Sequence, residues 1–195
     1  MRFHFRQNKT MYFMFLFCVV LGMVLGFVVI FSSDNYLKLL TSESKKLYPY
    51  INGTAETMVL FWKGLMSFSL PLLLIALLGI NFYLSLLSYV FITYQSSLFI
   101  LSCGAVIKTY GFSGFFNVLM LMVPVNLLYF CVLIYFSVVC INRSKLALKN
   151  KLFGYGFDES FFFSVAVSIV AVVLICVLIF VVYPMFLKNS VFLIF

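Results

Sequence analysis

The hydrophobic pattern is dominated by a run over residues 64–107 that contains no Asp, Glu, Lys or Arg. One helix needs about 20 apolar residues to cross a bilayer, so this run is long enough for roughly two crossings. Small polar residues interrupt it near its middle, at Asn81, Ser85 and Ser88. We therefore predict a turn at 81–86, with one span before it and another from about 86 to 107.

Three further uncharged stretches predict membrane spans at about 12–32, 115–141 and 161–183. Barrel strands would alternate apolar and polar residues, whereas these stretches are continuously apolar. Backbone groups in hydrocarbon must be paired within the segment, and a helix does this. The pattern therefore predicts an all-α fold, a polytopic transmembrane helical bundle of five spans.

Polar residues divide the chain into four parts. Residues 1–11 form a basic tail, 12–32 the first transmembrane span, and 33–63 an external segment. Residues 64–195 form a four-span membrane domain that carries a polar tip at 142–159.

The external segment has two interpretations. Tyr36, Leu40 and Leu47 fall on one side of a helical wheel, which indicates a short helix lying at the membrane surface. Glu43 and Ser44 interrupt that apolar side, so an ordinary exposed loop fits the pattern equally well.

Basic residues predict the orientation of the bundle. The tail that precedes the first span carries Arg2, Arg6 and Lys9 without an acidic residue, which favours a cytoplasmic N-terminus. The second basic cluster, in the tip at 142–159, returns to the cytoplasm only after an even number of crossings. Two spans in 64–107 provide that number, whereas one span would not.

Four residues are predicted to anchor the bundle at the membrane–water interfaces. Trp62 and Lys63 place an indole beside an ammonium group at the start of the second span, a combination that suits the headgroup level. Arg143 and Lys145 begin the basic tip after the fourth span.

Composition supports a membrane protein and gives little support to other classes. Apolar residues form 65% of the chain and charged residues 9%, against about 25% in globular domains. Mean hydropathy is +1.19. The net charge of +8 is explained by membrane topology and anionic lipids. No basic stripe with interleaved aromatic residues lies outside the spans, so we expect no nucleic-acid partner.

The inventory of reactive residues argues against an enzyme. His4 is the single histidine, and no catalytic triad or zinc site can be assembled around it from the predicted topology. The five cysteines lie in apolar stretches and form no C-x-x-C, so we interpret them as apolar filler. No nucleotide-binding glycine motif is present. We expect no catalytic residue, metal or cofactor.

The polar groups inside the spans are uncharged, which argues against ion-coupled transport. They are amides and hydroxyls, at Asn81, Thr93, Gln95, Asn117 and Asn126. In lipid such groups most often join helices, and less often they line a substrate site.

One short pattern combines two glycines, a proline and an amide. Gly111 and Gly114 stand three residues apart between the third and fourth spans and mark a turn or a close backbone approach. Pro124 lies inside the fourth span, where it frees a backbone carbonyl one turn earlier. The carboxamide of Asn126 is placed to bond either freed backbone or a neighbouring helix.

The sequence Gly111-x-x-Gly114-Phe115, followed by Pro124-x-Asn126-Leu127-Leu128, resembles the stage II sporulation protein M family. The layout of the chain also resembles that family, which has a basic N-terminus, one span, an external segment and four more spans. Some members carry a His and a Glu near the equivalent proline. This chain has Val125 and no acid there, which resembles the sporulation branch.

The resemblance implies a non-enzymatic scaffold in the cell membrane, at the septum if the host sporulates. Family members recruit peptidoglycan hydrolases, a lytic transglycosylase and an amidase, that remodel the wall during engulfment. Membrane lipids are the other expected partners. The alternative function is a membrane subunit of a transporter, such as an exporter permease that needs a separate ATPase. A third is an accessory membrane protein with no role in sporulation.

Overall fold

The computed structural model describes residues 8–32, 57–149 and 159–178. In this part of the chain the fold is helical and contains no strand, which confirms the all-α prediction. The elements in chain order are α2 (Lys9–Ser32), α5 (Thr57–Leu78), α6 (Phe82–Ser85), α7 (Leu87–Asn117), the π-helical turn η1 (Val118–Met122), α8 (Val123–Lys149) and α9 (Glu159–Val177).

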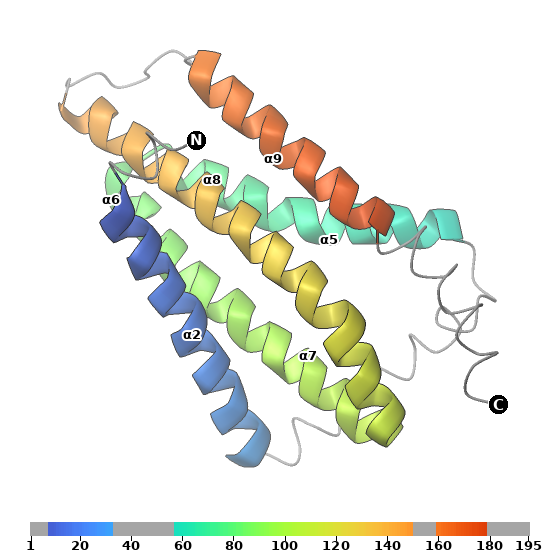
Figure 1. Cartoon of the computed structure of the whole chain (residues 1–195). Helices are drawn as coiled ribbons and strands as arrows, with labels where there is room; N and C mark the ends of the chain where they lie inside the picture. Colours follow the sequence, from blue (N-terminus) through green and yellow to red (C-terminus); the bar gives the residue numbers. More distant parts are fainter. Residues whose placement is uncertain (1–7, 33–56, 150–158, 179–195) are drawn as a thin grey trace.

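Helix α8 is the centre of the bundle (Figure 1). Helices α2 and α7 pack together on one side of α8, and α5 and α9 pack together on the other side. This central helix contacts each of the four long helices around it. Its inner positions are correspondingly buried, among them Leu133, Phe136 and Ile141.

Three helices among the described residues are long and apolar enough to cross a membrane: Lys9–Ser32, Phe82–Phe112 and Gly114–Leu148. Two shorter apolar helices, Leu65–Leu78 and Phe161–Val177, accompany them. Large apolar side chains cover much of the outer surface, and Phe17 and Phe31 are 65% and 87% exposed. Such a surface suits lipid and not water, and together with the three long apolar helices it indicates a membrane protein.

The predicted turn in the long uncharged run is confirmed. Helix α5 ends at Leu78, and α7 begins at Leu87 after the single turn of α6. The Tyr83 N–H donates to the side-chain oxygen of Asn81 at 3.0 Å, which caps α6. The polar residues thus break the run because Asn81 satisfies a backbone donor that the helix start leaves without a partner.

Several helices extend beyond their predicted ends. The second span begins at Thr57 and not at Gly64, so the last residues of the expected external segment are helical. Helix α8 continues to Lys149, so the first half of the expected tip at 142–159 is helical too. Charged residues ended our predicted spans, but a helix that leaves hydrocarbon keeps its backbone hydrogen bonds by continuing into the interface.

Some predictions fall outside the described residues. These are the possible surface helix at 34–56, most of the basic tail at 1–11, the remainder of the tip at 150–158, and the end of the fifth span at 183.

Helices α2 and α7 approach closely because glycines face the contact. A Cβ on Gly22 would lie 2.0 Å from the Ser96 Oγ and 2.2 Å from the Thr93 carbonyl oxygen. A Cβ on Gly26 would lie 2.8 Å from the Ser97 carbonyl oxygen. Two small residues four apart are a common device for bringing membrane helices together.

The starts of α2, α7 and α9 and the ends of α5 and α8 lie toward the same end of the bundle (Figure 1). Phe15, near the start of α2, stacks on Tyr89 near the start of α7, with ring centroids 4.2 Å apart. Ser144, near the end of α8, donates a hydrogen bond to the carbonyl of Gly79, just after α5. The first turn of α9 reaches the same end through Phe161. An even number of crossings before the tip puts the 81–86 turn and the 142–159 tip on one side of the membrane, and the described parts of both lie at this end of the bundle.

The five cysteines carry free thiols. Cys103, Cys140 and Cys176 are buried in the bundle, Cys18 is half-buried and Cys131 is exposed. Cys140 packs against Gly79, because a Cβ added to Gly79 would lie 2.9 Å from the Cβ of Cys140. The buried three are filler between helices, as the sequence indicated.

Candidate polar site inside the bundle

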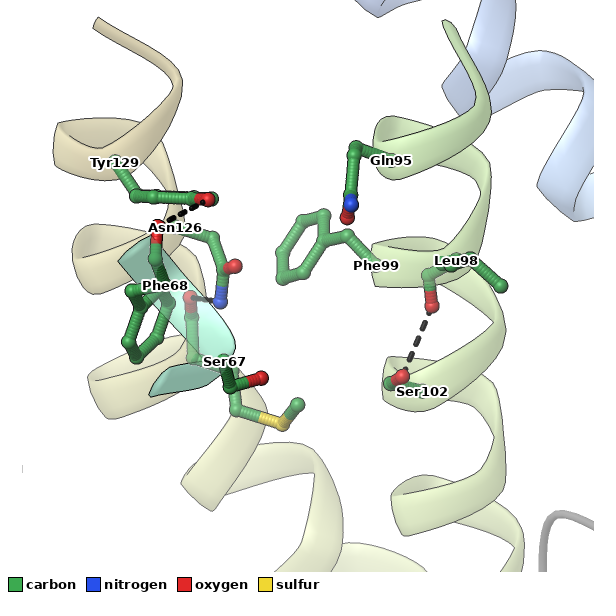
Figure 2. A pocket seen from close by; sticks show the side chains of 9 residues that line it. Ser67, Phe68, Gln95, Leu98, Phe99, Ser102, Asn126 and Tyr129 are labelled. Atoms are coloured by element: carbon green, nitrogen blue, oxygen red, sulfur yellow. Dashed lines mark hydrogen bonds between the residues drawn. The ribbon is translucent and has the colours of Figure 1, made fainter. Parts of the chain in front are cut away.

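A cavity of about 220 Å³ lies where α5, α7 and α8 converge (Figure 2). Both polar and apolar groups line it, and none of the lining side chains is charged. The lining residues are Ser67 and Phe68 from α5, Gln95, Leu98, Phe99 and Ser102 from α7, Met122 from η1, and Asn126 and Tyr129 from α8.

Asn126 reaches into this cavity from α8. Its Nδ2 donates to the Met122 carbonyl oxygen at 2.8 Å (Figure 2). This acceptor is backbone one turn earlier in the same segment, whereas we predicted either the carbonyl that Pro124 frees, which is that of Met120, or a neighbouring helix. The acceptor is the last residue of the π-helical turn, where the regular ladder of backbone bonds is disturbed. A carboxamide has two donor hydrogens and an acceptor oxygen, and this bond uses one hydrogen.

Gln95 lines the opposite wall of the cavity, on α7. Its side chain is half-buried and makes no hydrogen bond to another described residue. The amide is therefore held near the cavity with its full capacity to donate and accept.

One wall is fixed by a bond between α5 and α8. The Tyr129 hydroxyl donates to the Phe68 carbonyl oxygen at 3.0 Å, and the two rings meet edge to face with centroids 4.8 Å apart (Figure 2). On α7, the Ser102 hydroxyl donates to the Leu98 carbonyl oxygen at 2.9 Å. The Ser102 oxygen can still accept a hydrogen bond after it has donated this one.

The π-helical turn and Pro124 shape the wall that carries Asn126. Pro124 has no N–H, so the carbonyl four residues before it loses its helical partner. The chain at η1 directly before this proline winds with wider i to i+5 bonds. Pro124 itself faces outward and is exposed. The proline thus acts on the cavity through the backbone and is not among the residues that line it.

The glycine pair lies at the turn between the third and fourth spans and not at the cavity. Gly111 adopts φ 60° and ψ −130°, which separates two helical segments inside α7. A Cβ on Gly114 would lie 2.5 Å from the Val106 carbonyl oxygen. Both predicted roles are present, a turn at Gly111 and a close backbone approach at Gly114.

The predicted interface residues lie near helix ends. Trp62 is 53% exposed in the early part of α5, and Lys63 follows it there. The Arg143 guanidinium lies 4.0 Å from the centroid of the Phe161 ring, which joins the end of α8 to the start of α9. Lys145 is exposed one residue after the buried Ser144.

The structure therefore separates the residues that the sequence grouped. Asn126 and Gln95 line one cavity, whereas Asn81 caps α6 and Thr93 donates to the Tyr89 carbonyl of its own helix. The cavity residues Ser67 and Ser102 and the Gly22–Gly26 contact were missed. The spacing of the two glycines is visible in the sequence, but no sequence signal marks the serines.

No group of three or more His, Cys, Asp or Glu side chains suited to a metal occurs among the described residues. Comparisons with protein families, with curated proteins and with solved structures find no match to this chain.

Proposed function

We propose that this chain is a five-span membrane scaffold that recruits peptidoglycan hydrolases. Its N-terminus lies in the cytoplasm, and its site of action is the cell membrane, or the division septum if the host sporulates. The recruitment role rests on the resemblance of the Gly111–Gly114 and Pro124–Asn126 pattern to stage II sporulation protein M.

The observation that supports a five-span scaffold is the arrangement of helices around α8. Helix α5 has 22 residues and α9 has 19, which correspond to about 33 Å and 28 Å of length. Their apolar parts, Leu65–Leu78 and Phe161–Val177, cover about 21 Å and 25 Å. As spans beside the three longer helices they would cross a core of about 30 Å only together with the residues that flank these parts. A bundle closed around a central helix is a stable platform for partners that bind at its surface.

Affinity purification of the full-length protein from its native membranes tests the recruitment. We expect a lytic transglycosylase and an amidase to be recovered with it. The matched variant lacks residues 34–56, which lie outside the described residues and form the largest polar segment. Loss of the hydrolases from this variant, with normal membrane insertion, supports docking there. Unchanged recovery with the deletion contradicts docking at 34–56, and absence of hydrolases from the intact protein contradicts the scaffold.

The polar cavity favours a second function, a membrane subunit of a transporter. The cavity is lined by amides and hydroxyls from three helices, which is a common composition for a site that binds a polar substrate. Such a subunit needs a separate ATPase, because the sequence contains no nucleotide-binding motif. Recovery of an ATPase in place of hydrolases in the same purification favours this function.

A further inference from the structure

The polar groups of the cavity lie well inside the helical segments that carry them, at least about 12 Å from the ends of those segments. At 1.5 Å per residue, Ser67 is about 15 Å along α5 from Thr57 and Gln95 about 12 Å along α7 from Leu87. Asn126 is about 18 Å beyond Gly114, where the third long apolar segment begins. In a bundle that spans a bilayer, this is the depth at which polar groups are rare and often functional.

The lining of the cavity favours an uncharged ligand that carries hydroxyl groups. No lining residue carries a charge, so an ionic ligand would find no oppositely charged partner there. The carboxamides of Gln95 and Asn126 and the hydroxyl of Ser67 each donate and accept hydrogen bonds. Hydroxyl groups on a ligand match them, because a hydroxyl also donates and accepts from one atom.

The apolar lining and the volume select the size. Phe68, Leu98 and Phe99 provide carbon surface beside the amides (Figure 2). The volume of about 220 Å³ equals roughly seven waters at about 30 Å³ each. It is below the roughly 300 Å³ at which pockets for drug-sized ligands begin. A small polyol with a short carbon skeleton fits this volume and offers carbon atoms to the apolar side chains.

We propose that this cavity binds an uncharged polyol group of about the size of glycerol, held by the Gln95 and Asn126 carboxamides. This site goes beyond the scaffold role and does not depend on it. Two sources supply the same chemistry, the free headgroup of a diacylglycerol and a small water-soluble polyol.

The test uses full-length protein in phosphatidylcholine nanodiscs and two photoreactive probes. One is a 1,2-diacylglycerol with a diazirine beside its glycerol, and the other is a water-soluble glycerol ether with the same group. We expect one probe to label peptides that contain 95–102 and 122–129 in preference to the lipid-facing part of α2. The probe that labels them identifies the source.

The variant Gln95→Leu combined with Asn126→Leu is expected to reduce this labelling at least fivefold, since each lost hydrogen bond weakens binding by about that factor. Ser97→Ala is the matched control, because Ser97 lies outside the cavity and donates to the Tyr94 carbonyl of α7 at 2.8 Å. It is expected to label like the unchanged protein.

Gln95→Leu alone keeps the test decisive if the double variant misfolds, since Gln95 has no hydrogen-bonded partner among the described residues to leave unpaired. Folding is monitored by gel filtration and circular dichroism. Labelling of the cavity peptides that equals labelling of α2, or that persists in folded Gln95→Leu protein, overturns the proposal. A cavity that holds only water gives this result.

Discussion

At the scale of single residues, glycines set the geometry at two different places for two different reasons. Gly22 is required by space, because backbone and side-chain atoms of α7 occupy the position of a Cβ. Gly111 is required by conformation, because its φ of 60° is rare for other residues although nothing lies within 4 Å of an added Cβ. Substitutions at Gly22 and Gly111 therefore destabilise the fold by different mechanisms, steric clash at Gly22 and backbone strain at Gly111.

Gly22→Ala is expected to destabilise the bundle by about 1–3 kcal/mol, because α2 must move away from the Thr93 carbonyl. The measurement is unfolding of the purified protein by SDS in mixed micelles. Val24→Ala is the control, since Val24 is 55% exposed on the outer face of α2 and is expected to change stability by less than about 0.5 kcal/mol. Equal effects of the two variants would show that α2 does not pack through Gly22.

Gly111→Ala is expected to destabilise the protein by about 1–3 kcal/mol, because φ 60° with ψ −130° lies outside the regions open to L-residues. Gly111→Asn gives a sharper result. Asparagine tolerates the left-handed helical region near ψ +47°, but not ψ −130°, so it is expected to be no better than alanine. The same SDS titration measures both. A clearly milder effect of asparagine would indicate an ordinary left-handed turn.

At the scale of elements, hydroxyl groups join helices at their ends. The Ser144 hydroxyl donates to the Gly79 carbonyl after α5 and also lies 2.9 Å from the Cys140 carbonyl oxygen of its own helix. The first contact closes the turn between the second and third spans onto the central helix. It links residues 65 positions apart.

Ser144→Ala is expected to cost about 1 kcal/mol and to speed hydrogen exchange at the turn 79–86, because the Gly79 carbonyl loses a donor. Hydrogen exchange followed by mass spectrometry measures the local effect. Ser97→Ala removes a bond within one helix and is expected to leave the turn unchanged. Equal exchange in both variants would mean that the Ser144 bond does not hold the turn.

The elements also show how far the sequence predicts this fold. The turn at 81–86 was predictable because an uncharged run longer than one crossing must fold back, and Asn81 marks the place. The turn at Gly111 was predictable because two glycines, Gly111 and Gly114, interrupt an apolar pattern. The cavity was not predictable, since Ser67, Gln95 and Asn126 meet only through the packing of three helices distant in sequence. The π-helical turn before Pro124 also depends on its surroundings, because proline kinks a helix in more than one way.

At the scale of the whole molecule, the described starts of α2, α7 and α9 and the ends of α5 and α8 share one end of the bundle. The charge pattern favours the cytoplasm for this end. The Gly111 turn lies at the opposite end of α7 and is therefore expected outside the cell.

Single cysteines at two exposed positions test this orientation. In a background whose native cysteines are replaced by alanine, Phe112→Cys is expected to react in intact cells with a maleimide that does not cross membranes. Lys145→Cys is expected to react only after the cells are opened. Phe112 is 80% exposed, and Lys145 is exposed too, so both thiols are accessible within the fold. The reverse pattern would invert the topology, and labelling of both in intact cells would place them on one side.

The burial of three native thiols also provides a probe of folding that needs no engineered cysteine. Cys103, Cys140 and Cys176 are buried and belong to three different helices, α7, α8 and α9, whereas Cys131 is exposed. A small membrane-permeant alkylating agent should therefore modify Cys131 first and the enclosed three only as their helices separate. Mass spectrometry that resolves the order of modification would reveal which helix leaves the bundle first.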